Sequence, residues 1–183
     1  MCTCCQIQYI QCTGYLYTYS TKSRNLKMKG AQSLRHSSGV GVTEQCIQAF
    51  HEIKMNHRWL YIIYRISDDL KNIIIDEIGD RDRTYADFVD QLKDAERKKQ
   101  CRYGVYDVQF LQDHVPQERL VFFLWSPECA TIRQKMIYST SKAAFRLRLK
   151  GITTEMQCND DSDLAVSNVL ERCSRKYTFS PPI

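Results

Sequence analysis

Residues 119–151, RLVFFLWSPECATIRQKMIYSTSKAAFRLRLKG, decide the fold of this chain. The segment opens with an unbroken apolar run, residues 120–125, which is too short to cross a bilayer and is typical of a strand buried on both faces. Ser126 and Pro127 then predict a helix start, because serine is a good N-cap and proline fits the first helical position. We therefore expect a buried central strand followed by a helix.

The predicted helix carries two stripes at about 100° per residue. One stripe is apolar and consists of Ile132, Met136, Ala143 and Leu147. The other is cationic and consists of Lys135, Lys142 and Arg146. We expect the apolar stripe to face the core. The cationic stripe has two interpretations, an ordinary solvated helix face or a contact surface for an acidic partner.

Three pieces of this segment resemble the signature of the ADF/cofilin family: WSPE at 125–128, RQKMIYS at 133–139 and SKAA at 141–144. The family pattern is W-[SA]-P-[DE] followed by [RK]-x-K-M-x-Y-[AS]-S-S-K-[DE]-A. The resemblance covers residues 38–176. It implies the actin-depolymerising-factor homology fold, an α/β domain whose central five-stranded mixed sheet is sandwiched between helices.

Patterns elsewhere in the chain agree with that fold. Helices are predicted from Thr43 and from Thr84, and a last one contains Val166, Val169, Leu170 and Cys173. Aromatic and β-branched runs predict strands at 59–66, 71–78, 101–108 and 152–157, the first two forming a hairpin. Residues 111–118, with Pro116, are expected to be a short polar connection.

Charge distinguishes the first 37 residues from the rest of the chain. Residues 1–37 contain five basic residues and no acidic one, whereas the remaining 21 basic residues balance 21 acidic ones. We therefore predict a basic leader at 1–37, one domain at 38–176 and a tail at 177–183. The neutral body argues against a general nucleic-acid binder. For the leader, we favour a disordered extension over a targeting peptide.

The nine cysteines do not form a zinc pattern, and their odd number favours reduced thiols in a cytoplasmic protein. We interpret Cys46, Cys129 and Cys173 as small apolar residues of helices. Asp107 has no matched base or second carboxylate in the pattern, so we expect no enzyme activity, cofactor or metal.

The resemblance implies two sets of contacts with actin. Monomer contacts are implied at Ser38, Gly39, Val40, Arg133, Lys135, Met136, Lys142 and Arg146. Filament contacts are implied at Arg119, Glu171, Arg172 and Arg175. Ser38 corresponds to the serine at which phosphorylation switches off actin binding, although here it follows a long leader.

Two departures from the family pattern are expected to weaken binding. Ala143 replaces an acidic residue of the monomer site, and Gln117 stands where the filament site often has a second cation.

The resemblance implies a monomeric, cytoskeletal protein that severs and depolymerises actin filaments, prefers ADP-bound subunits and binds actin monomers. A phosphoinositide- or monomer-binding adaptor that does not sever remains an alternative, because the same cations suit lipid phosphates. A thiol or carboxylate enzyme is disfavoured. The basic run 97–99 keeps a nuclear location open as well.

Overall fold

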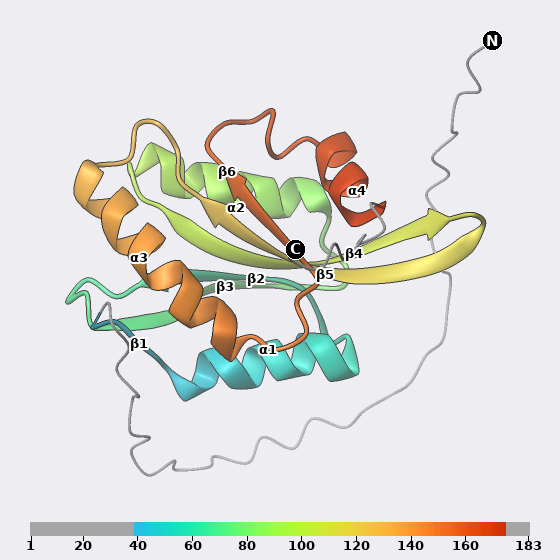
Figure 1. The fold of residues 1–183 in the computed structure, drawn as a ribbon, viewed down its shortest axis with the longest axis horizontal. Helices are drawn as coiled ribbons and strands as arrows, with labels where there is room; N and C mark the ends of the chain where they lie inside the picture. The colour runs from blue at the N-terminus through green and yellow to red at the C-terminus, as the bar shows by residue number, and fades with distance from the viewer. Residues whose placement is uncertain (1–38, 175–183) are drawn as a thin grey trace, which may run out of the picture. The chain divides into compact units, whose positions relative to one another are not determined.

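The computed structural model describes residues 39–174, which form a six-stranded mixed sheet with helices on both faces (Figure 1). The strands are β1 (Gly41–Val42), β2 (Trp59–Ile66), β3 (Asn72–Asp80), β4 (Arg102–Gln112), β5 (Val115–Trp125) and β6 (Thr154–Cys158). The helices are α1 (Glu44–Asn56), α2 (Tyr85–Arg97), α3 (Ile132–Arg148) and α4 (Val166–Ser174). The predicted leader, Ser38 and the predicted tail lie outside the described residues.

The sheet has the order β1-β3-β2-β4-β5-β6. Its four middle strands pair antiparallel, whereas β1 runs parallel to β3 and β6 runs parallel to β5. The predicted hairpin of β2 and β3 is confirmed. The apolar end of β5 lies between β4 and β6 and is buried, as expected for the run at 120–125.

Each face of the sheet carries its own hydrophobic core. On one face, side chains of α1 and α3 pack together, among them Phe50 and Phe145. On the other face, α2 and α4 contribute Phe88, Leu92 and Val169. Figure 1 shows the same division, with α1 and α3 on one side of the sheet and α2 and α4 on the other. The two faces of the sheet therefore have separate cores and separate pairs of helices.

The helix starts at Thr43 and Thr84 are confirmed. Thr84 forms a capping box with Asp87, in which the Thr84 hydroxyl accepts from the Asp87 amide and the Asp87 carboxylate accepts from the Thr84 amide. These bonds to the charged form lower the pKa of Asp87. Thr43 instead directs its hydroxyl to the carbonyl oxygen of Ile73, at 3.2 Å.

The prediction of five strands is wrong by one, because residues 41–42 form a strand of their own. The Gly41 amide donates to the Lys71 carbonyl oxygen at 2.7 Å, and the Thr43 amide donates to that of Ile73 at 3.2 Å. Val42 is buried beside them. Two residues are too few to show a strand period in the sequence.

The predicted polar connection at 111–118 is also wrong, because β4 and β5 form one long hairpin. Its tip is the pair Asp113 and His114, both with positive φ (51° and 64°), as a two-residue hairpin turn requires. Pro116 lies inside β5 opposite Leu111. β6 pairs with β5 only from Val121 onward, so one edge of β5 is open at Pro116 and the missing amide costs little.

The helix start predicted at Ser126 and Pro127 lies too early. The Ser126 amide donates to the carbonyl oxygen of Cys158 at 2.9 Å and so extends the pairing of β5 with β6. A turn follows, closed by the bond from the Ala130 amide to the Pro127 carbonyl oxygen. The N-cap is Thr131, whose hydroxyl accepts from the Gln134 amide.

Residue 79 of β3 must be glycine because the ring of Tyr61, on the neighbouring strand β2, packs directly over it. An added Cβ would lie 2.1 Å from Tyr61 Cε1, and Tyr61 is only 1% exposed. We expect Gly79→Ala to lower the free energy of unfolding by about 1–3 kcal/mol, because the buried ring must move. Denaturant unfolding measures this loss. An unchanged unfolding midpoint would contradict the packing of Tyr61 on Gly79.

Candidate functional site

The apolar stripe of α3 faces outward, so the prediction that it faces the core is wrong. Ile132 is 79% exposed, Met136 63% and Leu147 75%, and Ala143 is exposed beside them. Ile132 and Met136 line a shallow apolar depression. Such a row of exposed apolar side chains on one helix is typical of an interaction surface.

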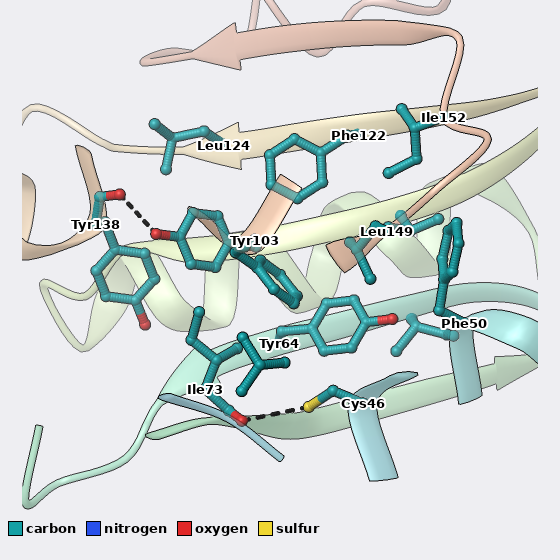
Figure 2. Close-up of a cluster of buried hydrophobic side chains, with 14 of the residues drawn as sticks. Cys46, Phe50, Tyr64, Ile73, Tyr103, Phe122, Leu124, Tyr138, Leu149 and Ile152 are labelled. Atoms are coloured by element: carbon teal, nitrogen blue, oxygen red, sulfur yellow. Dashed lines mark hydrogen bonds between the residues drawn. The ribbon is translucent and has the colours of Figure 1, made fainter. Parts of the chain in front are cut away.

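The opposite side of α3 anchors the helix through aromatic residues. Phe145 is fully buried, and its ring lies 5.1 Å from that of Tyr64 and 5.2 Å from that of Tyr103. The Tyr103 hydroxyl donates to the carbonyl oxygen of Tyr138 at 2.6 Å, as Figure 2 shows. Large aromatic side chains remove more apolar area from water than Met136 or Leu147 would, and this decides which side of the helix faces the sheet.

The cations predicted for this site lie along α3. Arg133 is exposed beside the apolar row and lines the same depression as Met136. Lys135 donates from Nζ to the carbonyl oxygen of Glu128 at 3.1 Å. Lys142 and Arg146, one turn apart, both pair with Glu155 of β6.

Of the predicted contacts before β1, Ser38 lies outside the described residues. Gly39 is exposed and has a φ of +73°, a value that favours glycine. Val40 as a whole is 3% exposed and packs in the core on the α1 and α3 face. Val40 therefore offers almost no surface to a partner in this structure.

The predicted filament contacts fall on a second surface, formed by β5 and α4. Arg119 is half-buried on β5, and its charge acts on the thiol of Cys173 in α4. Burial raises the pKa of Cys173 to about 11, and the Arg119 charge partly opposes that rise. Glu171 and Arg172 are exposed and line a polar depression between α4 and β6. Arg175 lies outside the described residues.

Asp107 of β4 links the end of β3 to the end of α1. Its carboxylate is buried and accepts a hydrogen bond from Arg81 at 2.5 Å. His57, at the end of α1, lies 3.2 Å from the same carboxylate oxygen and 3.5 Å from a carboxylate oxygen of Glu118. Because the Asp107 carboxylate is buried and occupied by these partners, its arrangement is that of a structural clamp.

Of the five cysteines in the described residues, four are buried and Cys129 is exposed. Cys129 lies in the turn before α3, so the prediction that it is an apolar residue of a helix is wrong, whereas Cys46 and Cys173 do lie buried on helices. Burial raises the pKa of Cys46 to about 11 and that of Cys158 to about 12.

Among these five cysteines, Cys129 is expected to react first with a thiol reagent at pH 8. The thiolate is the reactive form, and raised pKa values leave the buried thiols less of it. With burial added, we expect Cys46 to react at least about 100-fold more slowly than Cys129. Mass spectrometry of labelled peptides measures both rates, with the unfolded protein as the control. Equal rates in the folded protein would contradict the described burial.

None of the helices in residues 39–174 is long and apolar enough to span a membrane. The described part of the chain is thus a domain with an exposed apolar and cationic helix face, a second polar surface and a carboxylate clamp. This combination is typical of a protein that acts through surface contacts with a partner.

The comparisons with known proteins name the family. The family described as "Cofilin/tropomyosin-type actin-binding protein" matches residues 39–174. The chain belongs to this family, which is non-enzymatic. The cofilin of Yarrowia lipolytica is 40% identical over 147 residues, which are 79% of this chain and 93% of that protein. Actophorin of Acanthamoeba castellanii is 30% identical over 138 residues, covering 75% of this chain and 97% of that protein.

Solved structures agree with this assignment. The crystal structure of a cofilin from Streptomyces griseoflavus has a TM-score of 0.68 and 30% identity, covering 76% of this chain and 100% of the other. The structure of actin depolymerization factor 2 from Plasmodium berghei has a TM-score of 0.63 and 27% identity, covering 76% and 98%. The predicted fold class, a mixed sheet between helices, is confirmed.

Periodicity alone missed the outward orientation of Ile132 and Leu147, which it assigned to the core. The available signal was the second apolar side of the same helix, where Tyr138 and Phe145 recur at i and i+7. A helix with two apolar sides can bury only one of them against the sheet. The side with the smaller side chains then stays exposed and is a candidate contact surface.

Proposed function

We propose that this chain binds actin monomers and filaments, and that it severs and depolymerises the filaments. The observation that carries the proposal is the exposed apolar row of α3 with Arg133 and Lys135 beside it. A helix of this kind docks by placing apolar side chains in a groove of the partner. Cations at the rim favour an acidic surface around that groove. The similarity to relatives named cofilin and actin-depolymerizing factor supports actin as the partner.

Severing requires contact with more than one subunit of a filament, and two separate surfaces suit that task. The α3 surface belongs to one face of the sheet, whereas Arg172 of α4 belongs to the other (Figure 1). We propose that the α3 surface binds one actin subunit and that the surface with Arg119, Glu171 and Arg172 binds its neighbour. Arg175 is proposed to extend the second surface, and Ser38 to be the site at which a phosphate would weaken the first.

A second candidate function is a phosphoinositide- or monomer-binding adaptor that does not sever. The observation that favours it is the charge of the outer part of the β4–β5 hairpin, residues 109–118, which contains Asp113 and Glu118 and no lysine or arginine, with Gln117 beside Glu118. An acidic hairpin would meet an acidic filament surface with less attraction than a basic one. We therefore expect filament binding to be weaker than monomer binding.

Filament co-sedimentation together with imaging of labelled filaments tests the proposal. The full chain and a version that begins at Ser37 are compared, each with a variant in which Lys135→Glu and Lys142→Glu reverse two charges. Binding and filament breaks that disappear in the charge-reversed variants support severing. Binding without breaks supports the adaptor. Absence of actin binding by both lengths of the chain would contradict the proposal, and vesicles with phosphoinositides would then be the next probe.

A further inference from the structure

Glu155 of β6 forms ion pairs with Lys142 and Arg146, two of the cations that the resemblance assigns to the contact with actin. Its Oε1 lies 2.8 Å from Arg146 Nε, and its Oε2 lies 3.4 Å from Lys142 Nζ. We propose that Glu155 is an internal counter-charge that competes with the acidic partner for Lys142, and that Arg146 is a structural clamp. The identity of that partner as actin rests on the proposed function, whereas the competition itself does not.

Arg146 is held by more than Glu155. Its Nη1 donates to the Leu149 carbonyl oxygen at 3.1 Å, and its Nη2 donates to that of Ile152 at 2.7 Å. Both Nη nitrogens therefore donate hydrogen bonds within the domain, and Nε lies at ion-pair distance from Glu155 without forming a hydrogen bond. These contacts join the end of α3 to the connection that leads into β6. Arg146 would have to abandon them to reach a partner, which makes it a poor candidate for a direct contact.

Lys142 is held differently. Within residues 39–174, the carboxylate of Glu155 is the polar partner that the structure gives to its amine. The Lys142 side chain is 26% exposed and that of Glu155 is 39% exposed, so water reaches the pair. Ion pairs of this exposure are weak, since solvent screens them. An acidic group of a partner can thus replace Glu155 as the ion-pair partner of Lys142 at a small cost in free energy.

The counter-charge lowers the attraction that this end of α3 exerts. Lys142, Arg146 and Glu155 together carry one net positive charge, and they would carry two without Glu155. The remaining cations of the surface, Arg133 and Lys135, lie toward the other end of the helix. Glu155 therefore sets how strongly, and with what salt dependence, the α3 surface attracts an acidic partner.

An opposite role for Glu155 is to hold Lys142 ready for the partner, and the two roles predict opposite results. If Glu155 competes, Glu155→Gln tightens binding. If Glu155 positions Lys142, the same change weakens binding. A matched control is Glu128→Gln, which removes one acidic charge near the other end of α3. The Glu128 side chain is exposed, and Lys135 contacts this residue only at its backbone carbonyl.

The first measurement uses the full chain and polyglutamate, an acidic probe that does not depend on actin. We expect Glu155→Gln to tighten polyglutamate binding about fivefold more than Glu128→Gln does, with a steeper decline as salt is added. Thermal unfolding verifies that both variants are folded, as the exposure of these carboxylates leads us to expect. Equal tightening in the two variants, or weaker binding in Glu155→Gln, would overturn the inference.

A double-mutant cycle with Lys142→Met separates competition from simple net charge. We expect Lys142→Met to cost about threefold in affinity when Glu155 is present and about tenfold when it is Gln, because only the freed amine meets the probe fully. A smaller cost in the Glu155→Gln background would indicate positioning and overturn the inference. Arg146→Met removes the hydrogen bonds from Arg146 to Leu149 and Ile152. We therefore expect this variant to have a lower melting temperature, as measured by circular dichroism.

Repeating the binding measurement with monomeric actin keeps the two proposals distinguishable. Tighter polyglutamate binding by Glu155→Gln, without actin binding by any variant, would support the counter-charge and contradict the proposed function. Actin binding by the wild type, without tighter polyglutamate binding by Glu155→Gln, would support the function and overturn the counter-charge.

Discussion

Replacing Met136 by glutamate is expected to lower the affinity for monomeric actin about 100-fold, the size of effect found at a central interface residue. Met136 is 63% exposed in the middle of the apolar row of α3. In the free protein the new carboxylate is solvated, so the free energy of unfolding should change by less than about 0.5 kcal/mol. In the complex it would be buried in an apolar groove near an acidic surface, without a partner.

The chain offers a matched control for this change at the end of α1. Met55 is also exposed, at 57%, and lies on a different helix. Met55→Glu introduces the same side chain with the same loss of an exposed methionine, and we expect actin affinity within about twofold of the wild type. Fluorescence titration of labelled actin monomers measures both variants. Equal losses, or a loss only in Met55→Glu, would place the monomer contact elsewhere.

Replacing Phe145 by alanine is expected to lower the free energy of unfolding by about 3–5 kcal/mol, the range for a large aromatic residue removed from a core. Phe145 is fully buried and contacts the rings of Tyr64, Tyr103 and Phe122, with centroids 5.1, 5.2 and 5.9 Å away. The space it leaves is lined by rigid rings from three strands. These rings cannot collapse easily into the cavity.

The control for Phe145 lies two residues further along the same helix. Leu147 is 75% exposed, and Leu147→Ala should change the free energy of unfolding by no more than about 0.5 kcal/mol. Equilibrium unfolding in urea measures both variants. If Leu147→Ala destabilised the protein as much as Phe145→Ala, α3 would have to be rotated about its axis from the orientation that buries Phe145 and exposes Leu147.

Much of the fold could be predicted from local signals in the sequence. The run at 120–125 is apolar throughout, and a strand covered on both faces is the simplest way to bury it. Thr84 and Asp87 form a capping box at the spacing that marks a helix start. These features depend on residues close in the chain, so the sequence alone displays them.

The features that were predicted wrongly depend on contacts between distant residues. β1 forms because Gly41 pairs with Asn72 of β3, about 30 positions away in the chain. A strand of two residues is too short to show an alternating hydrophobic pattern in the sequence. The hairpin tip at Asp113 and His114 lacks glycine, the usual sign of such a turn. The orientation of α3 was ambiguous because both of its sides are apolar, and only the aromatic residues of β2, β4 and β5 decide between them.

The prediction of the candidate site rests more on the resemblance than on physical patterns. The resemblance placed Met136 in a contact surface, and its exposure agrees with that role, whereas periodicity placed it in the core. The resemblance also grouped Lys142 with Arg146. The contacts of Arg146 with Leu149 and Ile152 are specific to the folded chain and are not visible in a motif.

Photo-crosslinking determines whether the apolar face of α3 docks on actin. A benzophenone amino acid is placed in the full chain at Ile132, and in a second preparation at Met55, and each is irradiated with monomeric actin. If this face docks on actin, position 132 forms a covalent adduct with actin and position 55 forms none. An adduct from position 55 alone would contradict docking by this face.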